Sequence, residues 1–181
     1  MKKYTIYGMG AALVDTEIQV QDTELNAMGV DKGLMTLVDE SRQAELLAQL
    51  EGHLVKASHA SGGSAGNSMI AAAQFGAPTF MSCKVADDAD GAIYVQDLEQ
   101  AGVAHSMAQR PAGTTGKCLV LISPDAERSM NTFLGISETL SVEQLDPTAL
   151  AESEYLYIEG YLVTSDTGRA AAIRARELAE A

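Results

Sequence analysis

The chain has 181 residues, of which 46% are hydrophobic and 5% aromatic, so it suits one domain with a mainly aliphatic core. Its formal net charge of −13 disfavours binding to nucleic-acid phosphates or to anionic membrane surfaces. No apolar run approaches the roughly 20 residues of a membrane span, and the two cysteines lack any metal-binding spacing. We therefore expect a cytoplasmic protein with free thiols.

The apolar pattern predicts strands and helices that alternate along the chain. In chain order we expect strands at 4–9 and 13–21, a helix at 36–50, a glycine-rich stretch at 61–67 that opens a helix at 68–75, a strand at 79–85, a helix at 89–101, strands at 117–123 and 129–134, a helix at 141–151, a strand at 155–160 and a helix from 168 onward. This order favours a mainly parallel sheet covered by helices on both faces. The polar alternation at 13–21 and the strand pair near 117–134 suggest a separate flap.

Two glycine motifs resemble nucleotide-binding loops but lack essential parts. Residues 8–13 open like a dinucleotide-binding fingerprint, yet Leu13 replaces the third glycine, and a strand pattern follows where a helix is needed. Residues 113–118 contain a Gly-Lys pair, yet Pro111 stands in the place of the first glycine of a P-loop. Cys118 stands where that loop needs Ser or Thr to bind Mg²⁺. We interpret residues 8–13 as a plain turn between strands, and we do not expect a P-loop at residues 113–118.

Two other features suit a ligand that carries hydroxyl groups. The stretch Gly62–Ser68 has glycines that let backbone amides approach a ligand, and a helix pattern begins directly after it. Asn67 within it offers both a donor and acceptors. Asp15 lies between the first two strands, where a carboxylate can accept hydrogen bonds from two neighbouring hydroxyls. Taken singly, the first could be a connecting loop and the second a solvated aspartate.

Together these segments resemble the ribokinase, or PfkB, family of carbohydrate kinases, and most of all its adenosine-kinase-like branch. The resemblance covers nearly the whole chain and rests on Gly8-Met9-Gly10 with Asp15, Gly62–Ser68, Thr115–Ile122, Glu127–Met130 and Ile158–Tyr161. It implies a layered α/β/α fold with a mainly parallel sheet and a small β lid, formed by about residues 13–21 and 113–134. The whole chain, 1–181, would then be the N-terminal, substrate-binding portion of that fold.

The resemblance also assigns roles to individual residues. The residues implied to hold or border the hydroxyls of a small-molecule sugar or nucleoside are Asp15, Gly62, Gly63 and Asn67. Those implied to line the same pocket are Thr36, Cys118, Tyr161 and Leu162. The guanidinium of Arg128 would approach the phosphoryl group. Ala11-Ala12 stands where adenosine kinases tend to carry Asn-Pro, so ribose-like sugars and other nucleosides stay open as substrates.

The second signature of the family, an Asp-Thr-x-Gly-Ala-Gly-Asp run that contains the catalytic base, is missing from the sequence. Residues 165–169 begin in a similar way, but no Gly-Asp follows. We therefore expect the chain to stop before the ATP-binding part, to contain no catalytic residue and no metal site, and to be inactive alone. The complete protein would use ATP and Mg²⁺. The alternative is a non-catalytic sugar- or nucleoside-binding protein or pseudo-kinase fragment, and exposed lid strands make a homodimer plausible.

Overall fold

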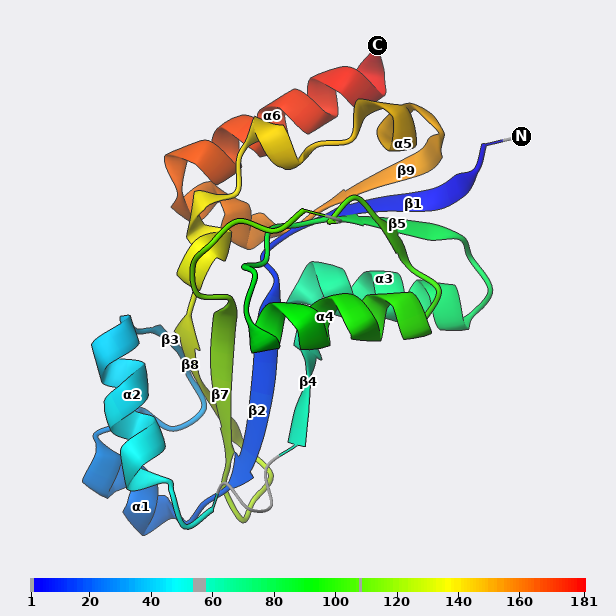
Figure 1. The fold of residues 1–181 in the computed structure, drawn as a ribbon. Helices are drawn as coiled ribbons and strands as arrows, with labels where there is room; N and C mark the ends of the chain where they lie inside the picture. The colour runs from blue at the N-terminus through cyan, green and yellow to red at the C-terminus, as the bar shows by residue number, and fades with distance from the viewer. Residues whose placement is uncertain (1, 54–57, 108) are drawn as a thin grey trace.

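A computed structural model describes residues 2–53, 58–107 and 109–181, which form two β-sheets (Figure 1). The first sheet is parallel throughout and has the strand order β6-β5-β1-β9. Its strands are β1 (Tyr4–Met9), β5 (Thr79–Ser82), β6 (Ala104–His105) and β9 (Ser153–Ile158). Because parallel strands need long crossover connections, helices separate them in the chain.

Helices cover both faces of the first sheet, as the sequence predicts. On one face lie α3 (Ser64–Gln74) and α4 (Ala89–Gln100), and on the other lie α5 (Pro147–Ala151) and α6 (Asp166–Glu180) (Figure 1). Each face has its own apolar core, with Met69, Met81 and Leu98 in the first and Leu150 and Ala171 in the second. None of the described helices combines the length and hydropathy needed to cross a bilayer.

The second sheet is mixed and has the strand order β3-β8-β7-β2-β4. Its strands are β2 (Leu13–Gln19), β3 (Met35–Leu37), β4 (Ser58–Gly62), β7 (Gly116–Ile122) and β8 (Arg128–Phe133). The pairs β2–β7 and β3–β8 are parallel, whereas β2–β4 and β7–β8 are antiparallel. Two short helices, α1 (Asp22–Met28) and α2 (Glu40–Gln49), lie beside this sheet, and a third apolar core forms between them (Figure 1).

Polar side chains at the N-caps fix where several helices begin. Asp39 accepts a hydrogen bond from the Arg42 amide at the start of α2, at 2.7 Å, and Asp88 accepts one at 2.7 Å in the first turn of α4. Ser165 caps α6 by accepting from the Gly168 amide at 3.0 Å, so the helix begins at Asp166 rather than at the predicted residue 168. Such caps satisfy amides that have no partner within the helix.

The structure corrects several predicted element boundaries. The single helix predicted at 36–50 is a strand followed by a helix, because residues 35–37 pair with β8 and the Asp39 cap starts α2 only afterwards. The helix predicted at 141–151 is split into a 3-10 turn and α5, which begins at Pro147 behind the Asp146 cap. The glycine-rich stretch contains the end of β4, and α3 begins at Ser64 rather than at 68. The strands β4 and β6 and the helix α1 were not predicted.

Candidate functional site

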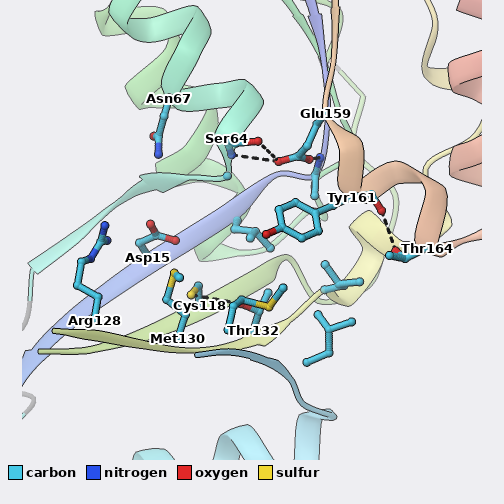
Figure 2. Close-up of a pocket in the computed structure, with 16 residues that line it drawn as sticks. Asp15, Ser64, Asn67, Cys118, Arg128, Met130, Thr132, Glu159, Tyr161 and Thr164 are labelled. Carbon is cyan, nitrogen blue, oxygen red and sulfur yellow. Dashed lines mark hydrogen bonds between the residues drawn. The ribbon is translucent and has the colours of Figure 1, made fainter. Parts of the chain in front are cut away.

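A pocket of about 280 Å³ lies between the second sheet, the start of α3 and the 3-10 helix Gly160–Thr164 that follows β9 (Figure 2). Its polar side chains include Asp15, Ser64, Asn67, Arg128 and Glu159, and its apolar ones include Leu13, Met35, Leu37, Met130 and Leu134. In Figure 2 the side chains of Asp15, Asn67 and Arg128 lie toward one end, and those of Tyr161 and Thr164 lie toward the other. The pocket therefore has a carboxylate, an amide and a guanidinium at one end, and apolar side chains make up much of the rest of its lining.

Asp15 lies in the middle of the second sheet, on β2, between Cys118 of β7 and Ala60 of β4. Burial raises the pKa of its carboxyl to about 6, although the nearby Arg128 guanidinium opposes this rise. Among the described residues, none donates a hydrogen bond to this carboxylate. A half-buried carboxylate without donors is an energetic cost to the folded chain, and donors from a ligand would relieve it.

Arg128, at the start of β8, is the cation of this pocket nearest to Asp15 in the view of Figure 2. Its Nη2 lies 3.5 Å from Glu17 Oε1, and about half of each side chain is exposed. An ion pair of this length and exposure contributes little to stability, on the order of 0–1 kcal/mol. Arg128 can therefore leave Glu17 for an anionic group in the pocket at small cost.

The glycine-rich stretch packs closely against three other segments of the chain. A Cβ on Gly62 would lie 2.1 Å from the Asp15 carboxylate, and one on Gly66 would lie 2.4 Å from the Tyr94 hydroxyl. Gly63 has φ +83°, and a Cβ there would lie 2.5 Å from the carbonyl oxygen of Ala11. Each glycine is thus required by a different neighbour, which explains why the sequence carries three of them within five positions.

The first turn of α3 contributes Asn67 and Ser64 to the pocket. The N-cap is Gly63, which has no side chain to cap the helix. The Ser64 amide instead donates to Glu159 Oε1 at 3.1 Å, and the Ser64 hydroxyl donates to the same oxygen at 2.6 Å. A carboxylate at a helix N-terminus is also favoured by the helix dipole. Glu159 therefore replaces the missing cap from a distant part of the chain.

Cys118 lies beside Asp15 on the floor of the pocket and is almost fully buried. The hydroxyl of Thr132 donates a hydrogen bond to its sulfur at 3.3 Å. Burial raises the pKa of the thiol to about 11, so Cys118 is protonated at neutral pH. It offers a ligand a soft, neutral surface rather than a nucleophile.

The structure brings most of the predicted site residues into this one pocket. Its lining includes Asp15, Gly63, Asn67, Cys118, Arg128 and Tyr161. Gly62 lies directly behind Asp15. Their role as ligand contacts stays a prediction. Two further residues that were predicted to line the pocket lie outside it. Thr36 does not line it, whereas its neighbours Met35 and Leu37 do. Leu162 is buried in the apolar core beneath α6.

Sequence reasoning missed Glu159 and the apolar part of the pocket lining. A charged residue directly after an apolar strand is a usable signal, because the carboxyl ends of parallel strands form a common edge. The apolar residues could have been found from the alternation in β8, where Met130 and Thr132 share one face with Arg128. The short strand β3 carries no such signal.

Comparisons with known proteins agree with this fold. The family model described as pfkB family carbohydrate kinase matches residues 32–181. A probable sugar kinase protein from Rhizobium etli superposes with a TM-score of 0.91 at 31% identity, over 99% of this chain and 54% of that one. An adenosine kinase from Sinorhizobium meliloti superposes with a TM-score of 0.90 at 34% identity, over 98% of this chain and 54% of that one.

An adenosine kinase from Anopheles gambiae, at 22% identity and a TM-score of 0.81, shares the fold. The comparison with curated proteins finds no match. The chain thus spans about half the length of the solved structures that it matches. Its first sheet with helices on both faces, its separate mixed sheet and the matched family model agree, and the chain belongs to the pfkB family of carbohydrate kinases.

Proposed function

We propose that this chain is the substrate-binding half of an ATP-dependent kinase that phosphorylates a hydroxyl group of a sugar or nucleoside. The observation that carries the proposal is the Asp15 carboxylate, which is half-buried, accepts no hydrogen bond from the described residues, and lines a pocket that also contains Asn67. The family assignment and the similarity to a bacterial adenosine kinase at 34% identity support the same reaction class.

The end of the pocket that contains Asp15 and Asn67 suits two neighbouring hydroxyls of a sugar ring. Each hydroxyl can donate to one oxygen of Asp15, and such bonds to a charged acceptor contribute about 1.5–3 kcal/mol each. The side chain of Asn67 offers a further donor and acceptor, and the turn at Gly63 leaves the backbone open to the ligand. A diol would thereby remove the cost of burying Asp15.

The apolar part of the lining favours a nucleoside over a free sugar. It includes Met35, Leu37, Met130 and Leu134, and the ring of Tyr161 also lines the pocket (Figure 2). Thioether groups and aromatic rings make favourable contacts with flat aromatic ligands. A free hexose would leave this surface uncovered, whereas a nucleobase attached to the sugar would cover it.

Arg128 supplies positive charge that the chain as a whole lacks. At a net charge of −13, the protein repels a nucleoside triphosphate at long range, so a local cation at the pocket has a clear purpose. We propose that Arg128 approaches the transferred phosphoryl group. Among the described residues, no three His, Cys, Asp or Glu side chains gather to hold a metal ion, and we assign no residue to ATP or Mg²⁺.

A homodimer and a cytoplasmic location belong to the same proposal. The strands β3 and β4 end the second sheet on its two sides, and an edge strand can pair with a second copy. Both cysteines are buried and free, which suits a reducing compartment. Light scattering of the purified protein tests the dimer, and a monomeric mass would contradict it.

A coupled ATP-consumption assay on the full-length protein tests the function. The acceptors are adenosine, inosine, ribose and fructose. We expect turnover with a nucleoside, and a loss of at least about a hundredfold in kcat/KM in Asp15→Ala, because two charge-assisted hydrogen bonds disappear. The exposed Asp31→Ala is the matched control. A folded protein without turnover on any acceptor would contradict the kinase proposal and favour a protein that only binds its ligand.

A further inference from the structure

Glu159 carries a carboxylate that is buried in the fold. It follows β9 directly, and its residue surface is 3% exposed. Among the residues that the structure describes, no Lys or Arg forms an ion pair with it. Burying a charge without a counterion is unfavourable unless hydrogen-bond donors surround it. The donors around Glu159 are therefore the key to its role.

Those donors come from two segments that lie far from Glu159 in the sequence. The Ala11 amide donates to Oε2 at 2.6 Å. The Ser64 amide and hydroxyl both donate to Oε1, at 3.1 and 2.6 Å, as the dashed lines of Figure 2 mark. One carboxylate therefore connects the end of β9, the link between β1 and β2, and the first turn of α3.

The surrounding backbone is shaped to admit this carboxylate. A Cβ on Gly10 would lie 2.6 Å from Glu159 Oε2, so only glycine leaves room at that position. The Glu159 amide donates to the carbonyl oxygen of Met9 at 2.9 Å, which extends the pairing of β9 with β1 by one residue. The position of Glu159 is thus fixed both by the hydrogen bond from its backbone amide and by the hydrogen bonds to its carboxylate oxygens.

The two connected segments lead to Asp15 and Asn67, the two side chains proposed to bind the hydroxyls of the acceptor. The link at Ala11 continues into β2, which carries Asp15, and the turn that begins with Ser64 carries Asn67. We propose that Glu159 is a positioning residue that sets the separation of Asp15 from Asn67 by holding these segments together. The inference rests on the proposed function, in which both side chains bind the acceptor. Three protein donors already occupy most of the acceptor capacity of the carboxylate.

Glu159→Gln in the complete protein tests this role, because the amide presents an NH₂ group to backbone N–H donors. Glu154→Gln, on the same strand and exposed, is the matched control. We expect KM to rise by about tenfold or more while kcat changes by less than about threefold, since the ligand groups are displaced but present. The rise should be the same for adenosine, inosine and 2′-deoxyadenosine. A KM effect that vanishes for the acceptor lacking one hydroxyl would overturn the proposal, because Glu159 would then contact that hydroxyl.

Hydrogen exchange measured by mass spectrometry gives a readout that does not depend on activity. In Glu159→Gln we expect the backbone amides of Ala11 and Ser64 to exchange about tenfold faster or more, with Glu154→Gln unchanged. If the wild type phosphorylates no acceptor, the proposed function fails, and exchange at these amides still decides whether Glu159 holds both segments. Unchanged exchange at both amides overturns the inference, even in an active enzyme.

Ser64→Ala is the second variant, for the case in which Glu159→Gln does not fold. It removes the 2.6 Å hydroxyl bond and leaves both backbone amides in place. We expect a smaller rise in KM, equal for all acceptors, and faster exchange at residue 64. A wild-type KM together with wild-type exchange in this variant would count against the proposal.

Discussion

Replacing Asp15 by Asn should make the protein more stable while it removes the proposed ligand contact. The carboxyl of Asp15 has a pKa of about 6 in the folded chain against an ordinary value of 3.8, chiefly because of burial. A carboxyl whose pKa rises on folding favours the folded state below 3.8, and this contribution is lost as the pH rises through about 6. At neutral pH the ionised group therefore costs stability.

The size of the effect follows from the two pKa values. Each tenfold change in proton affinity corresponds to about 1.4 kcal/mol, so the difference between 3.8 and about 6 corresponds to about 3 kcal/mol at most. Because part of the side chain is open to solvent, we take about half of that value. A gain of 1–2 kcal/mol should raise the melting temperature by roughly 3–6 °C in a protein of this size.

Thermal and urea unfolding at a series of pH values measures this gain. We expect Asp15→Asn to be more stable than the wild type above about pH 7 and to match it near pH 4, where the wild-type carboxyl is protonated. The exposed Asp31→Asn should follow the wild type throughout. A variant that is less stable at pH 7.5, or whose gain persists unchanged at pH 4, would refute the reasoning.

Further substitutions test the backbone of the pocket and of the second sheet. Gly63→Ala should lower the free energy of unfolding by about 1–3 kcal/mol, because φ is +83° and the new Cβ meets a carbonyl oxygen; Gly52→Ala, in open space, is the control in urea titrations. Ala126→Gly should raise the free energy of unfolding by about 0.5–1 kcal/mol, because Ala126 has φ +65° in the β7–β8 turn. A denaturation midpoint below that of the wild type would contradict this expectation. Gly66→Ala should lower the free energy of unfolding by about 1–3 kcal/mol, and Tyr94→Phe in the same chain should restore most of the loss, because the buried hydroxyl forms no hydrogen bond with any described residue. Equal midpoints for the single and double variants would show that the hydroxyl is not the obstacle.

The layered architecture could be predicted because its signals are local. Strands of the first sheet are short apolar runs, and helices such as α4 and α6 carry their caps and apolar periodicity within one stretch of sequence. The separate sheet could be inferred from the alternation of apolar and polar residues at 13–21, because this pattern is typical of a strand with one face in solvent. These features need no knowledge of distant partners.

The elements that were missed depend on contacts between distant residues. The three residues of β3 are a strand only because they pair with β8. Likewise, β4 reads as a polar, glycine-rich loop and pairs with β2 through the backbone. Glu159 reads as an ordinary strand-end charge until Ala11 and Ser64 are brought beside it. Propensity and periodicity carry no information about such partners. The sequence therefore predicted pocket residues such as Asp15 and Asn67, but not Glu159, which contacts the segments that carry them.

The pairing of β2 with β7 has a consequence for how the chain is made. Asp15 lies opposite Cys118 in a parallel ladder, and more than half of the 181 residues lie between them. During synthesis β2 therefore leaves the ribosome long before β7 has been made, and until then the edge of β2 that pairs with β7 has no partner. Contacts between such distant residues form slowly, because a long loop must close first. The pocket should be among the last parts of this chain to form during synthesis, after α3 and α4 have packed on the first strands.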